Sequence, residues 1–289
     1  MKKLLLVVLV LLAFVLAVSA LAALLVGGCG RGIAFGERIA LVTVSGPIMD
    51  SRQAVEEIKE YADDEGVAAI VLRVESPGGA VAPSQEIYTE VRRAAALKTV
   101  VVSMGALAAS GGYYISAPAT RIVANPGTLT GSIGVIMEIP NFKVLMEKVG
   151  VRTEVIRSGE HKGMASVMRD MTDEDRAILQ TLIDDVFAQF VTDVAEARGM
   201  AEEDVRALAD GRVYTGRQAL DLGLVDELGG LEHAVSVAAD LAGIEGEPNI
   251  VSRDENLSIV DLLRQSVTER LGGLADGFVP VKISYLYSP

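Results

Sequence analysis

A serine in a glycine-rich turn is the first candidate for chemistry in this chain. Ser110 lies in the run Ala109-Ser110-Gly111-Gly112, shortly after the apolar stretch 100–102, which predicts a strand. A serine at a strand-to-helix turn presents its hydroxyl at the edge of a sheet, and the N–H group of the next residue, Gly111, then points to where an acyl oxyanion would form. The pattern resembles the nucleophile elbow of hydrolases, although Ser-Gly-Gly alone also occurs in ordinary turns.

A second glycine turn follows another apolar stretch. Pro77-Gly78-Gly79 comes soon after residues 67–74, which also predict a strand. In α/β sheets, ligands bind beyond the carboxyl ends of the strands, and both turns stand at such ends. A glycine N–H group of this turn is therefore a candidate for a second oxyanion donor. The alternative is a tight turn that only starts a helix.

The base that a serine nucleophile needs is harder to identify from residue types. The two histidines, His161 and His233, stand in no recognisable triad pattern, and His233 is expected at a helix start on the surface. Lys162 lies in the glycine loop 158–163, and a lysine can serve as a base where burial among apolar groups favours its neutral form. Most lysines in such loops are solvated, and the Ser-x-x-Lys spacing of penicillin-binding enzymes is absent. The residues alone therefore leave the role of Lys162 open.

The elements that must position these residues alternate between strands and helices. Apolar runs predict strands at 39–44, 67–74 and 100–102, with helices over 53–62 and 84–97 between them. Such an alternation is typical of an α/β fold with a mainly parallel sheet that helices cover on both faces. Shorter strands are predicted at 121–124, 129–136 and 151–156, and further helices at 141–149, 173–198, 201–209, 215–222, 231–242 and 257–271.

The N-terminal segment has the composition of a membrane span. Residues 4–26 contain one polar residue, Ser19, and follow Lys2 and Lys3. A helix of this length reaches roughly 35 Å at about 1.5 Å per residue, enough to cross a hydrocarbon core of about 30 Å. The lysines favour a cytoplasmic N-terminus and a single pass, with the rest of the chain on the extracytoplasmic side of the membrane.

Two interpretations of this segment remain. A cleavable secretory signal has a shorter apolar region, of about 7–15 residues, which favours a retained transmembrane helix. The run Val26-Gly27-Gly28-Cys29, however, resembles a bacterial lipoprotein box with the only cysteine of the chain, Cys29, at the position of lipidation. Both interpretations place the remainder of the chain on the outer face of the membrane.

We expect four parts in the chain: an N-terminal membrane anchor or lipoprotein-type signal at 1–30, a linker at 31–37, one α/β domain with the candidate chemistry at 38–245, and a C-terminal helix and tail at 246–289. The tail ends in the aromatic run Ser284-Tyr285-Leu286-Tyr287. Such an end can pack at a subunit interface or lie in a substrate groove, but a flexible tail is the prediction that we favour.

The composition argues against several classes of function. The formal net charge of −13 at pH 7 disfavours nucleic-acid binding, because an acidic surface repels phosphate groups. One cysteine cannot form a disulfide within the chain, and no zinc-site spacing of histidines and cysteines is present. We expect no metal and no cofactor.

Several segments, taken together, resemble a known family, although no single segment is specific enough to do so. In chain order they are Val74–Gly79, Ser103–Gly105, Ala109–Ser116, Leu129–Val135, Ser158–Lys162, Asp210–Gly216 and Leu224–Gly230. Across about residues 39–230 this set resembles the bacterial signal peptide peptidase A (SppA) family, a group of serine–lysine peptidases with the ClpP/crotonase-type fold. The chain corresponds to the short form of the family, with one catalytic domain.

The resemblance implies a role for each matched residue. Ser110 corresponds to the nucleophile, Lys162 to the general base, and Ser132 to a serine that hydrogen-bonds the lysine amine. The N–H groups of Gly79 and Gly111 would form the oxyanion hole. The implied substrates are hydrophobic peptides, in this family the signal-peptide remnants left in the membrane, and the implied assembly is a ring-like homo-oligomer in which adjoining subunits can contribute the lysine and the serine.

Two other functions remain as alternatives. A crotonase-like acyl-CoA enzyme would share the paired oxyanion turns, but such enzymes commonly use carboxylates for acid–base work, and none lies in the turns here. A catalytically silent scaffold for membrane proteases is the non-enzymatic alternative, and the complete set of Ser110, Lys162 and Ser132 argues against it.

Overall fold

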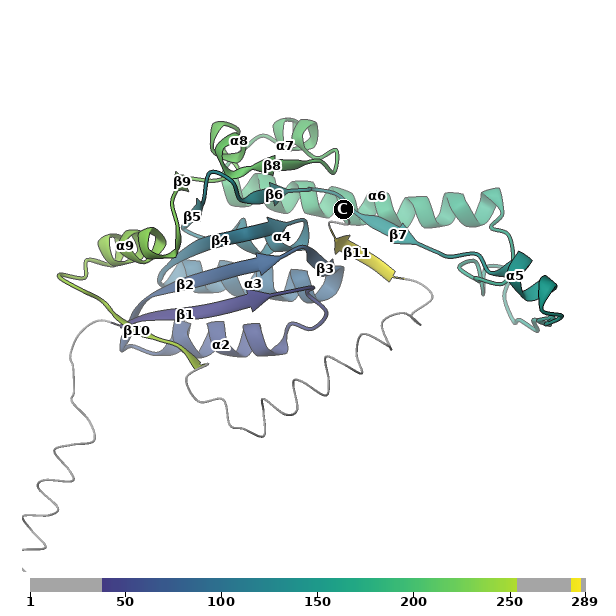
Figure 1. The fold of residues 1–289 in the computed structure, drawn as a ribbon, viewed down its shortest axis with the longest axis horizontal. Coiled ribbons are helices and arrows are strands. Elements are labelled where there is room, and N and C mark those ends of the chain that lie inside the picture. Colours follow the sequence, from purple (N-terminus) through teal and green to yellow (C-terminus); the bar gives the residue numbers. More distant parts are fainter. Residues whose placement is uncertain (1–37, 254–281, 287–289) are drawn as a thin grey trace, which may run out of the picture. The chain divides into compact units, whose positions relative to one another are not determined.

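The computed structural model describes residues 38–253 and 282–286 (Figure 1). The expected anchor at 1–30 with Cys29, the linker at 31–37 and the helix at 257–271 lie outside the described residues. Among the helices of the two described ranges, none has both the length and the apolar character that a bilayer crossing needs.

The main sheet is built around three long parallel strands. Its order is β10-β1-β2-β4-β5-β9, and every neighbouring pair along it is parallel. Its strands are β1 (Arg38–Ser45), β2 (Val67–Ser76), β4 (Thr99–Ala109), β5 (Arg121–Ala124), β9 (Glu227–Leu228) and β10 (Asn249–Val251). The expected mainly parallel sheet is therefore confirmed.

Helices cover both faces of this sheet, as the figure shows (Figure 1). Ile70 and Leu72 of β2 pack into one core with α2 (Arg52–Asp63), α3 (Val81–Leu97) and α4 (Gly111–Ser116). The alternate residues Ala69 and Val71 pack against α9 (Leu231–Ala242) on the other face. Because side chains alternate between the faces and both faces are buried, these strands are almost continuously apolar in sequence.

The chain adds smaller elements beyond the carboxyl end of the main strands. Strand β6 (Leu129–Gly131) pairs in parallel with the end of β4, and β8 (Val213–Thr215) pairs antiparallel with β6. A second sheet has the order β3-β11-β7, formed by β3 (Gly78–Ala80), β11 (Lys282–Leu286) and β7 (Ile136–Glu138). The remaining helices are α5 (Lys143–Lys148), α6 (Asp173–Arg198), α7 (Glu202–Leu208) and α8 (Gly216–Asp221).

Helix α6 begins and ends at the residues that the sequence predicts. The Thr172 hydroxyl accepts a hydrogen bond from the Asp175 N–H group, the Asp175 carboxylate accepts one from the Thr172 N–H group, and Gly199 ends the helix in the left-handed conformation. The C-terminal half of α6 is buried through Phe190, Val191 and Val194. In its N-terminal half, Asp175 is the only buried residue.

The segment that we call the arm, residues 136–183, consists of β7, α5, the following loop and the N-terminal half of α6. Figure 1 shows these elements extending away from the main sheet, with α5 near their far end. Two predictions are wrong here. The strand expected at 129–136 is divided into β6 and β7, and residues 151–156 form no strand.

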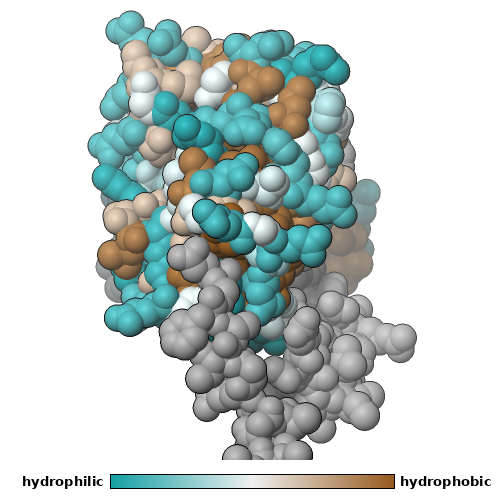
Figure 2. Space-filling model, turned by 90° about the vertical axis from the view of Figure 1, so that its left-hand side faces the viewer, coloured by the Kyte–Doolittle hydropathy of each residue, from teal (hydrophilic) through white to brown (hydrophobic). Residues whose placement is uncertain are grey.

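The arm also carries much of the exposed apolar surface of the described residues. Exposed large apolar side chains on it are Ile136, Phe142, Val144, Leu145, Val149, Val151, Val155, Ile156 and Leu182. By contrast, Figure 2 shows a face on which hydrophilic side chains predominate and apolar ones form smaller patches. Residues 151–156, of which Val151, Val155 and Ile156 are apolar, are therefore exposed at positions where the sequence predicts a strand.

The C-terminal segment 282–286 forms the central strand of the second sheet. Strand β11 pairs antiparallel with β3 on one side and with β7 on the other. The prediction of a flexible tail is therefore wrong for these five residues.

Candidate active site

Ser110 is held in a strained turn between β4 and α4. Its backbone has φ 53° and ψ −116°, and among the described residues only Ser110 and Ser132 combine a side chain with a positive φ. Such a conformation costs on the order of 1–3 kcal/mol and is found mostly at functional sites. The Ser110 N–H group donates to the Gly131 carbonyl over 2.7 Å, and the Ser110 carbonyl accepts from the Tyr114 N–H group over 2.8 Å. These two hydrogen bonds fix the turn.

Ser132 stands at the end of the neighbouring strand. Ala109 of β4 pairs with Gly131 of β6 in parallel, so the residues that follow them, Ser110 and Ser132, leave the same edge of the sheet side by side. The Ser132 N–H group donates to the Arg212 carbonyl over 2.9 Å. Both serines are buried, with exposed fractions of 1% and 6%. The structure thus brings these two predicted residues together.

The two glycine turns meet beside Ser110. A side-chain carbon on Gly78 would lie 2.6 Å from the Gly111 nitrogen, and one on Gly111 would lie 3.1 Å from the Gly79 nitrogen. Only glycines permit such an approach of two backbones, and Gly78 also has a φ of 97°. The N–H groups of Gly79 and Gly111 therefore belong to one small region at the end of the sheet.

Backbone hydrogen bonds orient the turn at 78–80. The Gly78 carbonyl accepts from the Ile48 N–H group over 2.8 Å, and the Ala80 N–H group donates to the Ile48 carbonyl over 2.7 Å. Because the polar groups of successive residues in a strand point to opposite sides, the N–H group of Gly79 points away from Ile48 and toward β11. The Ser76 hydroxyl accepts a further hydrogen bond from the Gly78 N–H group, over 3.1 Å.

Lys162 lies apart from these groups within the chain. It is exposed in the loop that joins α5 to α6, on the arm. Ser110 and Ser132, by contrast, are both buried. His161 is exposed beside Lys162, and His233 pairs with Glu227 at 2.9 Å on the surface at the start of α9. One chain therefore assembles the two serines and the two glycine amides, but not the lysine.

An aromatic cluster next to Ser110 was missed by the sequence analysis. The Tyr114 ring stacks on Tyr88 at a centroid distance of 4.7 Å and meets Phe190 edge-on at 4.9 Å. The Tyr114 hydroxyl donates to the Asp193 carboxylate, and the Tyr88 hydroxyl donates to the Asp193 carbonyl over 3.0 Å. Tyr114 belongs to the matched segment 109–116, so that match was the one available signal; Tyr88 and Phe190 come from other helices.

Burial determines the ionisation of this cluster. It raises the pKa of Tyr88 to about 12 and raises that of Tyr114 further, where the hydrogen bond to Asp193 adds to the effect. Both phenols are therefore neutral at physiological pH and remain hydrogen-bond donors. Within the described residues, no group of three or more His, Cys, Asp or Glu side chains is arranged to hold a metal ion.

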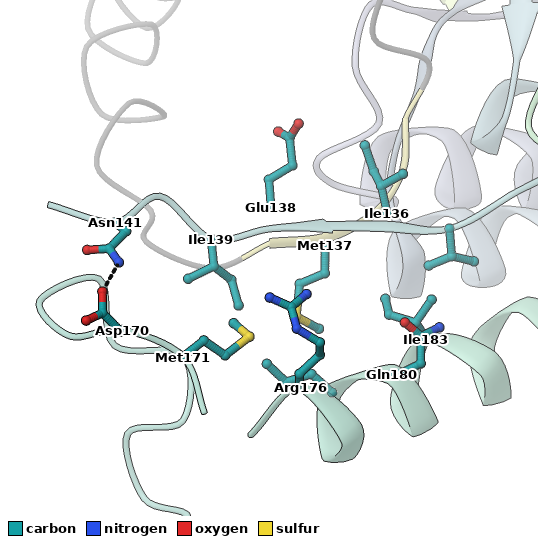
Figure 3. Close-up of a pocket in the computed structure, with 12 residues that line it drawn as sticks. Ile136, Met137, Glu138, Ile139, Asn141, Asp170, Met171, Arg176, Gln180 and Ile183 are labelled. Atoms are coloured by element: carbon teal, nitrogen blue, oxygen red, sulfur yellow. Dashed lines mark hydrogen bonds between the residues drawn. The ribbon is translucent and has the colours of Figure 1, made fainter. Parts of the chain in front are cut away.

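A separate cavity of about 750 Å³ lies on the arm, between β7 and α6. Figure 3 shows Met137, Ile139 and Met171 on its wall, with Arg176 rising from α6 and Glu138 pointing to the other side of β7. The Asn141 amide closes one end through a hydrogen bond of 3.0 Å to Asp170. None of the predicted site residues lines this cavity.

Comparisons with known proteins agree on one family. The model of "Peptidase family S49" matches residues 92–245, a range that contains Ser110, Ser132 and Lys162. The "Putative protease slr0021" of Synechocystis sp. is 46% identical over 210 residues, which cover 72% of this chain and 76% of that protein. The "Putative signal peptide peptidase SppA" of Enterococcus faecium is 35% identical over 216 residues, 70% of this chain and 63% of that protein.

Other relatives are longer than this chain. "Protease 4" of Salmonella typhi is 38% identical over 243 residues, which cover 81% of this chain but 39% of that protein. Among solved structures, a ClpP1 mutant from Listeria monocytogenes superposes with a TM-score of 0.46 and 17% identity, covering 67% of this chain and 93% of that one. At this score the likeness does not establish a shared fold.

Proposed function

We propose, on the premise that this chain belongs to peptidase family S49 and is a serine protease, that it is a membrane-anchored endopeptidase with a Ser–Lys dyad. Its substrates are hydrophobic peptides, among them signal-peptide remnants. The observation that carries the proposal is the strained turn of Ser110, which stands against the amides of Gly79 and Gly111. Because the chain belongs to a peptidase family, we do not propose the alternative of an acyl-CoA enzyme.

In the proposed reaction, neutral Lys162 takes the proton of the Ser110 hydroxyl while Oγ attacks a peptide carbonyl. The N–H groups of Gly79 and Gly111 stabilise the oxyanion that forms. The C–N bond then breaks, Lys162 gives its proton to the leaving amine, and an acyl-enzyme remains. Lys162 next takes a proton from water, whose oxygen attacks the ester, and Ser110 recovers its proton as the acid product leaves.

Ser132 is proposed to hold the lysine in place. Its buried position on the strand next to Ser110 would let its hydroxyl accept a hydrogen bond from the amine of Lys162. Burial beside apolar side chains such as Ala108 and Ile133 would favour the neutral amine that the reaction needs.

We further propose that Lys162 acts across a subunit boundary in a ring-like homo-oligomer. Two observations support this arrangement: Lys162 is exposed on the arm, and the arm bears a row of exposed apolar side chains, such as Leu145 and Ile156. Exposed apolar surface of this kind marks interaction sites. An arm that packs on a neighbouring copy would bury these side chains and carry Lys162 to the neighbour's Ser110.

The proposed location is the bacterial cytoplasmic membrane, with the catalytic domain on the extracytoplasmic side. The apolar segment 4–26 and its flanking lysines support a single-pass anchor, and lipidation at Cys29 is the alternative attachment. A tether of either kind confines the enzyme and an apolar peptide to one surface, which raises their effective concentration.

The pH–rate profile of peptide hydrolysis tests the dyad. A lysine that acts as the general base predicts that kcat/KM rises with pH through a single ionisation of the free enzyme. The residual activity of Lys162→Ala should lose this ionisation, and a covalent serine probe should label Ser110 in the assembled wild type. An unchanged profile in Lys162→Ala would refute the assigned base, and the absence of labelling at Ser110 would refute the nucleophile.

A further inference from the structure

Helix α4, which begins directly after Ser110, is too short to hold its own position. It has six residues, Gly111–Ser116, and helices far shorter than about 12 residues are marginal by themselves. Its first two residues, Gly111 and Gly112, have no side chains that could anchor it. Because the Gly111 N–H group is a proposed oxyanion donor, the geometry of the site depends on what holds the rest of this helix.

Two tyrosines of α4 reach acceptors on other parts of the chain. The Tyr113 hydroxyl donates to the Leu224 backbone carbonyl over 3.1 Å. The Tyr114 hydroxyl donates to the side-chain carboxylate of Asp193 on α6, and hydrogen bonds to a charged acceptor are roughly twice as strong as those between neutral groups. The Tyr114 N–H group donates to the Ser110 carbonyl over 2.8 Å. Tyr114 thus connects the backbone of the nucleophile to Asp193.

Asp193 belongs to a part of α6 that the core holds in place. Its neighbours Val191 and Val194 are fully buried. Its backbone carbonyl also accepts a hydrogen bond of 3.0 Å from the Tyr88 hydroxyl of α3, and the rings of Tyr88 and Tyr114 stack at 4.7 Å. The two phenols therefore share a stack and a partner residue, but only Tyr114 lies on α4.

We propose that Asp193 is a positioning residue of the peptidase: through Tyr114 it holds the first turn of α4, so that the Gly111 N–H group stays where the oxyanion forms. This inference rests on the proposed function, because it concerns the same oxyanion donor. Such donors act at about 2.7–3.1 Å from the oxyanion, and a displacement of about 1 Å can lower the rate about 10²-fold. Tyr114 is 1% exposed and packs in the core cluster, so it acts through the turn.

Kinetics of the full-length chain test this inference, with Tyr88→Phe as the matched control. Tyr114→Phe removes one hydroxyl and keeps the ring. It should lower kcat, and the rate at which a fluorophosphonate probe labels Ser110, about 10–100-fold, with KM within about twofold. Tyr88→Phe removes the equivalent hydroxyl from α3 and should leave both rates close to those of the wild type. A merely structural role would lower the stability of both variants and leave kcat of the folded protein unchanged.

Two variants of Asp193 show whether it acts through Tyr114. Asp193→Asn keeps an oxygen acceptor and should retain most of the activity, whereas Asp193→Ala should lose about as much as Tyr114→Phe. The double variant Tyr114→Phe, Asp193→Ala should be no slower than the slower single variant, because the effects of residues that act as one unit are not additive. Circular dichroism checks that each chain is folded.

Amide hydrogen exchange of residues 110–116 separates this inference from the proposed function, because it requires no chemistry at the site. Exchange should be faster in Tyr114→Phe and Asp193→Ala than in the wild type, and unchanged in Tyr88→Phe. Wild-type rates in folded Tyr114→Phe, an equal loss in Tyr88→Phe, or additive losses in the double variant would overturn the positioning role even if the wild type hydrolyses peptides. The expected exchange differences, together with a wild type that neither hydrolyses peptides nor is labelled, would sustain the hold of Asp193 on the turn and defeat the enzymatic assignment alone.

Discussion

The two residues of the proposed dyad, Ser110 and Lys162, lie in regions that differ in burial. Ser110 is buried at the end of a parallel sheet, in a turn fixed by hydrogen bonds to Gly131 and Tyr114. Lys162 is exposed on an arm that bears several exposed large apolar side chains. The first region is complete within one chain. The second exposes apolar side chains among charged ones, and exposed apolar surface of this kind marks an interaction site.

The two regions also differ in what positions their functional groups. The nucleophile and the oxyanion donors are positioned by the fold, before any partner or substrate binds. The base is positioned by assembly, in our proposal, so that one chain alone holds an inactive half-site.

The largest effect that we expect comes from removing the base. Lys162→Ala should lower kcat by about a thousandfold or more, since general acid–base catalysis contributes up to about 10⁴ and dyad members act as a unit. The far-UV circular dichroism spectrum should not change, because the side chain is exposed within its own chain. Lys148→Ala, an exposed lysine of α5 on the same arm, is the matched control and should keep full activity.

Mixed oligomers decide whether the two regions meet across subunits. Ser110→Ala and Lys162→Ala protomers, each inactive alone, should recover a fraction of the sites when they are co-assembled. No recovery in oligomers whose mixed composition is verified by mass spectrometry would refute the cross-subunit dyad and return Lys162 to the Ser110 of its own chain.

The sequence predicts the first region far better than the second. The runs 39–44 and 67–74 predict strands correctly because a strand that is buried on both faces has an apolar side chain at almost every position. Helix α6 is predicted at its two ends because Thr172 and Gly199 act locally as caps. The segment 151–156 misleads because its β-branched residues favour a strand, although no other described strand pairs with it.

The candidate site divides in the same way. The Ser110 turn has a local signal, because its small neighbours and its position after a strand are visible in sequence. The contact of Gly78 with Gly111 and the packing of Tyr285 on Phe190 join residues that are far apart in the chain. No spacing rule predicts them, since they depend on how the second sheet closes. The place of Lys162 would require the assembly, which a single sequence does not contain.

The second largest effect concerns the preorganised region. Gly78→Ala should lower kcat about 10²–10³-fold, as does the loss of one oxyanion donor, because the new methyl group would collide with the Gly111 nitrogen and the Tyr285 carbonyl. The positive φ of Gly78 adds strain. Gly127→Ala is the control, because a side-chain carbon there meets no atom within 4 Å. Unchanged kcat in Gly78→Ala would show that this turn does not belong to the site.

A smaller and concentration-dependent effect should come from the arm surface. Leu145→Asp with Ile156→Asp introduces two charges at positions that are 56% and 101% exposed. We expect weaker assembly in sedimentation velocity and about tenfold lower activity at dilute protein, with the fold intact by circular dichroism. Leu97→Asp, at 58% exposure on α3 and outside the arm, should leave assembly unchanged. Equal assembly of both proteins would place the subunit contact elsewhere.

The smallest effect tests the stability of the arm against that of the core. The Arg169 guanidinium holds the pKa of Asp175 well below its usual range, and the Thr172 N–H group adds to this as the helix cap. Because the folded-state pKa is lowered, the stabilisation is present above the unfolded value of about 3.9 and is lost as the pH falls through the folded-state pKa. Asp175→Asn should therefore speed amide hydrogen exchange in the first turns of α6 at about pH 7, and the difference from wild type should shrink below about pH 4.

Exchange near Phe190, in the buried half of the same helix, should change less, because packing in the core stabilises that half. Asp173→Asn, an exposed acid in the same first turn, is the control. A uniform change along α6 would mean that the helix opens as one unit and that the arm has no separate stability.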